Sequence, residues 1–520
     1  MIKEFNYGTG RLTIGICLDI AAGETKGIID DKAAAGIKRS WQEVEKIAHS
    51  HNPVYGINTG FGPLCDTRID ENDTSLLQSN LLKSHSVGVG KPIPAEIAKI
   101  MLITKVQALA QGYSGIAPAT LSRIVWHIDN DIIPVVPEKG SVGASGDLAP
   151  LSHLFLPLLG LGEVLIKGER HPSSKILKQH NLEPLTLGPK EGLALINGTQ
   201  FILAFAVKAV QRLHHALELA DLIGAMSLEG LMGSARPFDA RLHNIRPYRG
   251  GKLVAYRLAT LLNESEICNS HINCDRVQDP YSLRCMPQVH GASRNAWLHL
   301  KELTEIELNS VTDNPIILSA EDTISGGNFH GQPMALPLDY ATVAAAELGN
   351  IADRRCYLMS EGRYGLPKVL TEHPGLNSGL MIPQYTTAAL VTENKTLCFP
   401  SSADSVPTSL GQEDHVSMGS ISGRKLHMVL DNLEYIQAIE LLYAAQAMDF
   451  RRPLRSTPVV EACYELVRQH VPYIENDRIF AADINQLHQL VISSELLETA
   501  NATAQKHNIN LNNDEEFGIY

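Results

Sequence analysis

Long stretches of helical periodicity constrain the fold of this chain more than any other feature of its sequence. Apolar residues recur every three or four positions in five segments, which favours amphipathic helices of about 20 residues or more. These segments are 95–112, 201–232, 292–311, 339–360 and 425–448. Several helices of this length in one chain are typical of a long helical bundle, so we expect a mainly α fold.

Strand patterns are few, and we expect short strands only at 12–18, 164–166 and 316–318. Thr199 is a suitable N-cap for the helix predicted to begin at position 201. The polar segment 508–516 is expected to fray, as polar terminal segments often do.

The length of 520 residues allows two or three domains or one large intertwined unit. We divide the chain approximately into an N-terminal region, 1–200, and a long-helix bundle with a C-terminal helical region, 201–520. The net charge of −13 disfavours nucleic acid and anionic membranes as partners, because both require a basic face.

The cysteines and the apolar segments bear on the cellular compartment. Eight cysteines are scattered without a CxxC pair, which argues against a disulfide scaffold and against a zinc ribbon. The first 20 residues lack the apolar core of a signal peptide. The most apolar stretch, 148–166, is broken by prolines, glycines and polar residues and does not read as a transmembrane helix. We therefore expect a cytoplasmic protein.

Glycine-rich loops separate the predicted helices, although a helical bundle does not require so many glycines. Loops on a rigid scaffold are where chemistry tends to be placed. We therefore expect the functional residues in or beside five loops, at 55–62, 140–146, 197–199, 325–332 and 375–385.

The segment GSVGASGDLAPLSH, at 140–153, allows more than one interpretation. It can be a turn of small residues before a helix, with Asp147 as the cap. A serine-hydrolase elbow requires G-x-S-x-G, and Asp147 breaks that pattern. A phosphate-binding loop requires a following G-K-[ST], which is absent.

A third interpretation of the same segment is backbone cyclisation of Ala144-Ser145-Gly146. Glycine has no Cβ, so the amide nitrogen of Gly146 can approach the carbonyl carbon of Ala144. Ser145 can then lose water to leave an exocyclic methylene group. The product is a conjugated electrophile, which no standard side chain supplies. Spacing alone leaves both the simple turn and the cyclisation open.

The segment resembles the signature of the aromatic amino-acid ammonia-lyases and aminomutases. The resemblance continues in YGINTGFG, INGTQ, VQDPYSLRC, SVTDNP, GGNFHGQ and QEDHVSM, at 55–62, 196–200, 277–285, 310–315, 326–332 and 412–418. It implies that Ala144-Ser145-Gly146 forms 4-methylidene-imidazol-5-one (MIO), with no metal or diffusible cofactor. It also implies a homotetramer of the family's type, with active sites shared between subunits.

Two positions indicate the substrate within this family. This chain resembles the members that act on histidine, because it carries Ser-His at 84–85 and a glutamate at position 413, Glu413. Imidazole carries a donor and an acceptor, so Glu413 can accept its N–H and His85 can pair with the other ring nitrogen. A buried glutamate facing a phenyl ring would be unsatisfied. Each residue taken alone also fits a structural role, Glu413 as a helix-start acid and His85 as a core histidine.

The resemblance therefore implies non-oxidative deamination of L-histidine to trans-urocanate and ammonia, in histidine degradation. A tyrosine or phenylalanine ammonia-lyase, or an MIO-dependent aminomutase, is the alternative. Met286 and His290 stand where histidine-acting members often carry Gln and Met, which leaves the fine geometry of the pocket open.

The resemblance also implies roles for individual residues. Tyr55 is the general base for the β-proton, and its pKa must be lowered for that task, for example by amide donors from its glycine loop. Arg284 anchors the substrate carboxylate, because a guanidinium pairs with a carboxylate through two hydrogen bonds. Phe329 packs on the substrate ring.

Three further residues are expected to hold the MIO carbonyl or the substrate carboxylate. They are Asn197, Gln278 and Tyr281, and the last two are three positions apart, so one helical face can present both inward. The sequence does not decide whether the amine or the imidazole of the substrate reacts with the electrophile.

Overall fold

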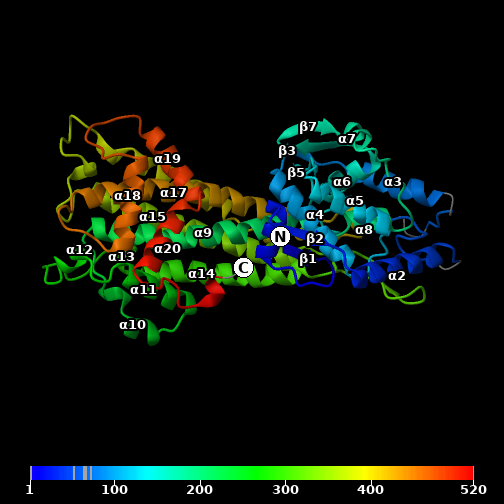
Figure 1. Ribbon diagram of the computed structural model, residues 1–520, viewed down its shortest axis with the longest axis horizontal. Helices are drawn as coiled ribbons and strands as arrows, with labels where there is room; N and C mark the ends of the chain where they lie inside the picture. Colours follow the sequence, from blue (N-terminus) through cyan, green and yellow to red (C-terminus); the bar gives the residue numbers. More distant parts are fainter. Residues whose placement is uncertain (1–2, 51–52, 63–66, 71–72, 519) are drawn as a thin grey trace.

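The computed structural model describes residues 3–50, 53–62, 67–70, 73–518 and 520. It confirms the mainly α fold, with long helices joining two lobes at opposite ends of an elongated molecule (Figure 1). The N-terminal residues form one lobe and much of the C-terminal half forms the other. The division at residue 200 stays a prediction.

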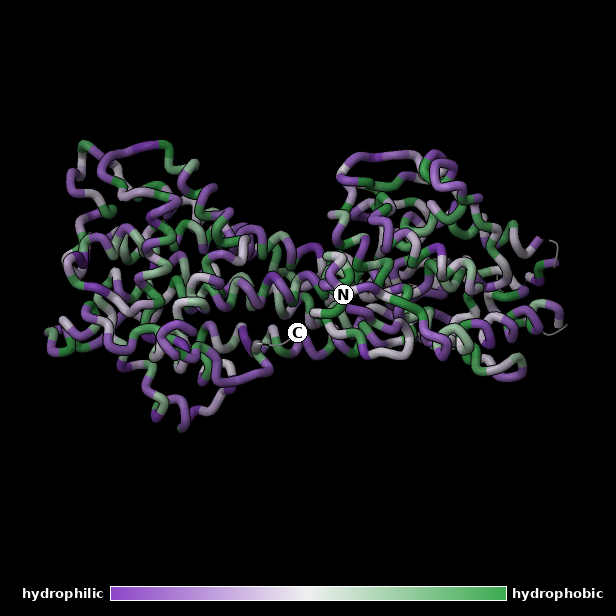
Figure 2. Tube along the Cα trace, in the orientation of Figure 1, coloured by the Kyte–Doolittle hydropathy of each residue, from purple (hydrophilic) through white to green (hydrophobic). Residues whose placement is uncertain are grey.

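All five long helices predicted from periodicity are present. They are α4 (Ala95–Ala110), α9 (Gln200–Gly230), α14 (Met286–Leu308), α15 (Gln332–Ser360) and α17 (Gly419–Asp449). Helix α17 packs along α15 and α9, and α14 packs against α15 and α9, which makes the central bundle. Most residues of α9 are buried, as expected of a helix enclosed on all sides. Figure 2 shows polar and apolar residues alternating along these helices.

Helix α4 packs against α9 and so joins the central bundle to the N-terminal lobe, which contains several further helices. They are α1 (Ile14–Ala22), α2 (Asp31–Ala48), α3 (Thr74–His85), α5 (Pro118–Asp129), α6 (Leu148–Phe155), α7 (Ser173–Gln179) and α8 (Glu191–Ile196). The strand predicted at 12–18 is wrong. Helix α1 occupies this segment because the Thr13 hydroxyl accepts from the Ile16 amide and Gly23, at φ 81°, ends the helix.

Short strands form four small sheets among the described residues. Strands β1 (Lys3–Asn6) and β2 (Thr25–Ile28) pair in parallel. The other sheets are antiparallel: β3 (Val89–Pro92) pairs with β5 (Pro137–Lys139), and β8 (Ile316–Ile317) pairs with β9 (Thr323–Ile324). In the three-stranded sheet, β6 (Glu163–Ile166) lies between β4 (Ile133–Pro134) and β7 (Glu169–Pro172). The strands predicted at 164–166 and 316–318 are confirmed in β6 and β8.

The remaining helices build the second lobe and the outside of the bundle. They are α10 (Ala240–Asn244), α11 (Arg249–Leu261), α12 (Glu266–Asn269), α13 (Tyr281–Arg284), α16 (Pro383–Leu397), α18 (Pro458–His470), α19 (Phe480–Ile492) and α20 (Glu495–Lys506). The prediction that 508–516 frays is wrong. Arg249 binds Asp514 and Glu516, and Phe517 is buried in the core, so the segment is tied down at its end.

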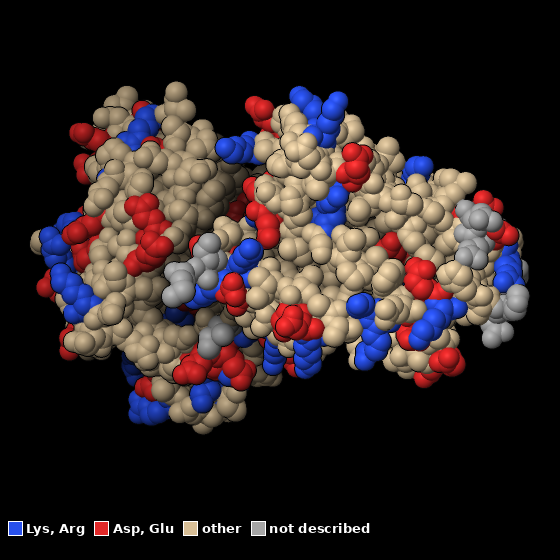
Figure 3. Space-filling view, turned by 45° about the vertical axis from the view of Figure 1, so that its right-hand side comes forward, with Lys and Arg blue, Asp and Glu red and all other residues tan. Residues whose placement is uncertain are grey.

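The surface agrees with the mixed charge of the sequence. Figure 3 shows acidic and basic side chains interspersed over one face, without a large field of a single sign. Within the part of the chain that the structure describes, no helix combines the length and the apolar character needed to cross a membrane.

Candidate active site

A cavity of about 1040 Å³ lies in the N-terminal lobe, where four of the five predicted glycine-rich loops meet. It gathers seven of the residues predicted for the site, namely Tyr55, His85, Ala144, Ser145, Asn197, Phe329 and Glu413. The fifth loop, 375–385, does not line the cavity. Instead, the amides of Ser378 and Gly379 donate to the carboxylate of Asp477.

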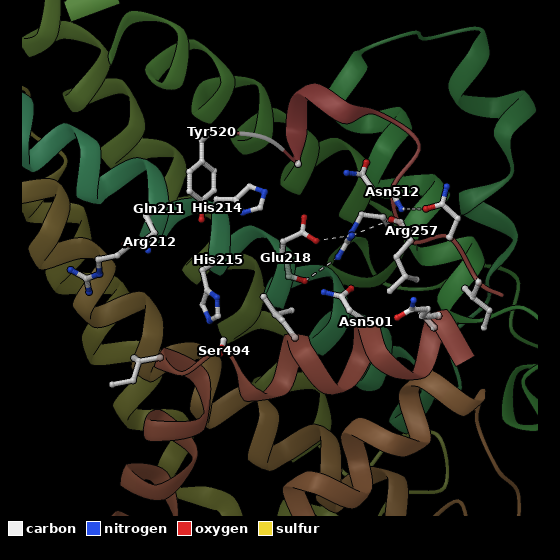
Figure 4. Close-up of a pocket in the computed structure, with 18 of the residues that line it drawn as sticks. Gln211, Arg212, His214, His215, Glu218, Arg257, Ser494, Asn501, Asn512 and Tyr520 are labelled. Atoms are coloured by element: carbon white, nitrogen blue, oxygen red, sulfur yellow. Dashed lines mark hydrogen bonds and ion pairs between the residues drawn. The ribbon is translucent and has the colours of Figure 1, made fainter. Parts of the chain in front are cut away.

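A second cavity, of about 930 Å³, lies between α9, α20 and the C-terminal segment (Figure 4). Its charged groups bind one another: Arg257 pairs with Glu218 at 2.7 Å, and Arg212 pairs with Glu434 at 2.9 Å. The ring of His214 is hydrogen-bonded to a backbone carbonyl. These groups stabilise the bundle, so the first cavity is the candidate active site.

The turn at Ala144-Ser145-Gly146 is held against the loop that follows α8. Gly146 has φ 74°, and a Cβ there would lie 2.1 Å from the carbonyl oxygen of Gly198. The same oxygen accepts from the amide of Asp147 at 2.7 Å. The Asn197 side chain donates from Nδ2 to the Ser145 carbonyl oxygen, also at 2.7 Å. Only glycine therefore fits at 146, and the carbonyl of the central serine already has a polar donor.

Asp147 does not cap its own helix, contrary to the simple-turn interpretation of this segment. It precedes α6, but its carboxylate accepts from the amides of Phe201 and Ile202, at 3.1 and 3.0 Å, in the first turn of α9. Thr199, the predicted cap of α9, instead donates its hydroxyl to Glu307. Burial raises the pKa of Asp147 to about 7, against the opposing effect of these hydrogen bonds. The turn is thereby attached to the start of the central bundle.

Glu413 is not a helix-start acid. It follows a short 3₁₀ turn, Ser409–Gly411, whereas α17 begins only at Gly419. One carboxylate oxygen accepts from the Thr408 hydroxyl at 2.7 Å, and the other accepts from the Ser145 hydroxyl. The carboxylate therefore lies directly beside the serine of the turn.

His85 ends α3 and lines the same cavity. Its Nδ1 lies 2.9 Å from the Leu81 carbonyl oxygen, so Nδ1 carries the proton of the neutral ring and Nε2 is the acceptor. Burial lowers the pKa of His85, and the Leu81 carbonyl and the Glu413 carboxylate oppose this effect. His85 thus presents an acceptor rather than a positive charge at neutral pH.

Tyr55 and Phe329 stand on two of the glycine loops. The phenolic oxygen of Tyr55 accepts from the Gly62 amide at 3.2 Å, which favours the ionised phenol. Both side chains are half-buried, so each can still be reached from the cavity.

Three of the predicted site residues do not line this cavity within one chain, namely Gln278, Tyr281 and Arg284. They lie around α13, at the end of the molecule opposite α3 and α8 (Figure 1). The expectation of one inward helical face is wrong, because Gln278 precedes α13 and the Tyr281 side chain is 71 % exposed. The Arg284 guanidinium lies over the Tyr281 ring and donates to Gln278 at 3.0 Å. The three residues form one surface cluster.

Two residues close to the turn were missed from the sequence. Thr408, which holds Glu413, stands in a loop without any distinguishing pattern. Lys105 lies in the buried part of α4, between Thr104 and Val106, and a lysine next to so many apolar residues could have revealed it. Among the described residues, no group of three or more His, Cys, Asp or Glu side chains could hold a metal ion.

The helical bundle and the Ala-Ser-Gly turn in a cavity with a tyrosine and a carboxylate define a carbon–nitrogen lyase of the ammonia-lyase type. A sequence profile described as aromatic amino acid lyase matches residues 12–469, and the chain belongs to this family.

Named relatives agree with this assignment. The chain is 48 % identical to the histidine ammonia-lyase of Stigmatella aurantiaca, over 89 % of this chain and 92 % of that protein. It superposes on histidine ammonia-lyase from Trypanosoma cruzi with a TM-score of 0.89 and 39 % identity, over 99 % and 96 % of the two chains. Tyrosine aminomutase from Streptomyces globisporus gives a TM-score of 0.91 and 34 % identity, over 97 % and 99 %.

Proposed function

We propose that this lyase deaminates L-histidine to trans-urocanate and ammonia. The observation that carries the proposal is the presence of His85 and Glu413 in one cavity with the Ala144-Ser145-Gly146 turn. A site with polar groups of this kind strongly rejects a substrate ring that cannot bind them. Two of the relatives named above are histidine ammonia-lyases, which supports the same substrate.

We also propose that Ala144-Ser145-Gly146 matures to MIO. The surrounding residues fit this group, because Asn197 donates to the Ser145 carbonyl and Gly146 occupies a position without room for a side chain. The group supplies an electrophile that the standard side chains lack.

The other residues of the cavity bind the substrate and move its proton. Tyr55 accepts the β-proton at its phenolic oxygen, where the Gly62 amide stabilises the ionised form. Glu413 accepts an N–H of the imidazole, and Nε2 of His85 pairs with the other ring nitrogen when that nitrogen carries a proton. Phe329 covers the ring from the opposing loop.

A homotetramer with shared active sites completes this arrangement. No lysine or arginine is present among the described residues that line the cavity, so the substrate carboxylate has no cationic partner there. Arg284, with Gln278 and Tyr281, can supply that partner from another copy of the chain, because the cluster lies on the surface. The cytoplasm is the proposed location, since the seven described cysteines are free, as is usual in a reducing compartment.

The test is to mix the purified protein separately with L-histidine, L-tyrosine and L-phenylalanine and to follow near-ultraviolet absorbance. A rise with histidine alone, matching urocanate, supports the proposal. A rise only with tyrosine or phenylalanine contradicts the roles of His85 and Glu413. A monomeric mass by light scattering contradicts the shared site.

A further inference from the structure

A buried lysine is linked to the Ala144-Ser145-Gly146 turn through Asn197 and has no part in the roles assigned above. Lys105 stands on α4, and its side chain is 1 % exposed. Its Nζ donates to the backbone carbonyl of Asn197 at 2.7 Å and to the Gln200 side chain at 3.5 Å. A buried ammonium group is costly unless polar partners compensate for the water it has lost.

Lys105 differs from the other buried lysines in its partners. Lys190 pairs with Asp313 at 2.7 Å, and Lys99 pairs with Asp131 at 2.9 Å. Among the described residues, no carboxylate lies within 4.0 Å of the Lys105 nitrogen. Its charge is therefore not neutralised by an ion pair, and its nearest partner is the carbonyl of Asn197.

More distant charges also act on Lys105. Asp313 and Asp147 favour its charged form, and Lys190 opposes it. Burial dominates and lowers the pKa of Lys105 to about 7.

A chain of hydrogen bonds connects Lys105 to the turn. Lys105 holds the backbone carbonyl of Asn197, and Nδ2 of the same asparagine holds the carbonyl of Ser145 at 2.7 Å. The side-chain oxygen of Asn197 is buried and makes no hydrogen bond to the described residues. The orientation of the Asn197 amide therefore depends on its backbone, and Lys105 binds the carbonyl of that backbone.

We propose that Lys105 is a positioning residue for maturation of the turn and for the chemistry that follows. Its ammonium group holds the Asn197 backbone so that the side-chain amide stays on the Ser145 carbonyl oxygen, and its charge strengthens that hydrogen bond. The proposal rests on the proposed function, because it takes the cyclisation of Ala144-Ser145-Gly146 as given.

The atoms of the maturation show where this support is needed. The Gly146 nitrogen bonds to the Ala144 carbonyl carbon, whose oxygen leaves as water with the hydrogens of the Gly146 and Ser145 amides. Ser145 then loses its α-hydrogen and its hydroxyl as a second water. When the α-hydrogen leaves as a proton, negative charge collects on the Ser145 carbonyl oxygen. The Asn197 amide, backed by Lys105, stabilises that charge.

The test compares Lys105→Met, which removes the charge and keeps the length, with Lys105→Arg, which keeps a cation. Lys99→Met is the matched control, because it makes the same change on the same helix in a pair with exposed Asp131. The measurements are intact mass, which reports the loss of two waters, near-ultraviolet absorbance, circular dichroism, and kcat and KM for the amino acid that the wild type accepts.

We expect Lys105→Met to fold like the wild type and to mature incompletely. Its kcat per matured site falls by about 10-fold or more, as for loss of one hydrogen bond to a charged group, and KM changes little. In Lys105→Arg, the extent of maturation and kcat per matured site both lie between those of Lys105→Met and the wild type. Lys99→Met behaves as the wild type.

Three outcomes overturn the proposal, and they can be told apart. Full maturation and a wild-type kcat in Lys105→Met show that Lys105 has no positioning role. Loss of folded protein in Lys105→Met assigns the residue to stability instead. A wild type that never loses the two waters contradicts the proposed function itself. A wild type that matures but prefers tyrosine contradicts only the proposal that histidine is the substrate, because the loss of two waters by mass does not depend on the substrate.

Discussion

The Ser145 hydroxyl donates to a carboxylate oxygen of Glu413, and the Thr408 hydroxyl holds the other oxygen at 2.7 Å. The carboxylate thus has one fixed oxygen and one that depends on the serine hydroxyl. In the proposed maturation, loss of that hydroxyl would release the second oxygen. The same side chain can therefore bind the serine before maturation and the imidazole of the substrate afterwards.

Replacing Glu413 with glutamine should weaken catalysis on histidine. We expect kcat/KM to fall by about 10- to 100-fold, the usual effect of losing a hydrogen bond to a charged group. Steady-state kinetics measure this, and intact mass shows whether the turn of the variant has matured. Thr408→Val should give a smaller loss, because it frees the carboxylate without removing it. An unchanged kcat/KM in Glu413→Gln would assign the residue to structure alone.

The replacement Gly146→Ala should abolish maturation. The new Cβ would lie 2.1 Å from the Gly198 carbonyl oxygen, in a backbone conformation with φ 74° that costs a non-glycine residue of order 1–3 kcal/mol. We expect no loss of water by mass and no activity. Gly36→Ala is the control, because a Cβ at Gly36 meets no atom within 4 Å. A Gly146→Ala protein that matures would refute this account of the turn.

The stability of the protein should depend on pH through the protonation of Asp147. Its pKa is raised to about 7 in the folded state from an ordinary value near 3.8, so the folded chain binds the proton more tightly. Its stabilising contribution is complete below the ordinary pKa and is lost as the pH rises through about 7. The Tm of the wild type minus that of Asp147→Asn should therefore decrease from pH 5 to pH 8. A constant difference would show that Asp147 does not titrate in this window.

Acidification should remove the contribution of His85 to substrate binding. Its pKa lies below the ordinary histidine value, and below that pKa both ring nitrogens become donors. The ratio of kcat/KM for the wild type to that for His85→Gln should fall on the acid side. Titration of the substrate cancels in this ratio, because both enzymes use the same histidine. A ratio independent of pH would exclude His85 as the acceptor.

Two inactive variants should restore activity when they assemble together. Tyr55→Phe removes the proposed base, and Arg284→Met removes the proposed carboxylate anchor. Arg284 stands on α13, at the end of the molecule opposite α3 and α8 (Figure 1). If sites combine different subunits, mixed tetramers contain some sites with both residues intact. Co-expression followed by an assay for urocanate tests this. Activity no higher than in either variant alone would contradict the shared site.

Much of this architecture could be predicted from the sequence because it depends on local pattern. The helices α4, α9, α14 and α17 follow the apolar periodicity, and the glycine loops predict where the cavity lies. The segment 12–18 was misassigned because its apolar residues suit a strand as well as a short helix. The Thr13 cap that decides between them is a single hydroxyl.

The relations between distant segments could not be predicted in this way. Asp147 caps a helix that begins more than 50 positions later, and Lys105 supports Asn197 from another helix. Neither contact has a spacing that a sequence displays, because each depends on how α4, α6 and α9 pack. The proposed contribution of Arg284 to a site depends further on assembly of more than one chain, which no pattern in a single sequence displays.

The bond from Asp147 to the first turn of α9 has a consequence for biosynthesis. Because the turn is held by α9, the proposed cyclisation would require α9 to dock first, and a newly made chain would keep an unreacted serine until then. The proposed electrophile would then mark the chains whose central bundle has assembled. Misfolded copies of this protein would accordingly carry no such reactive group.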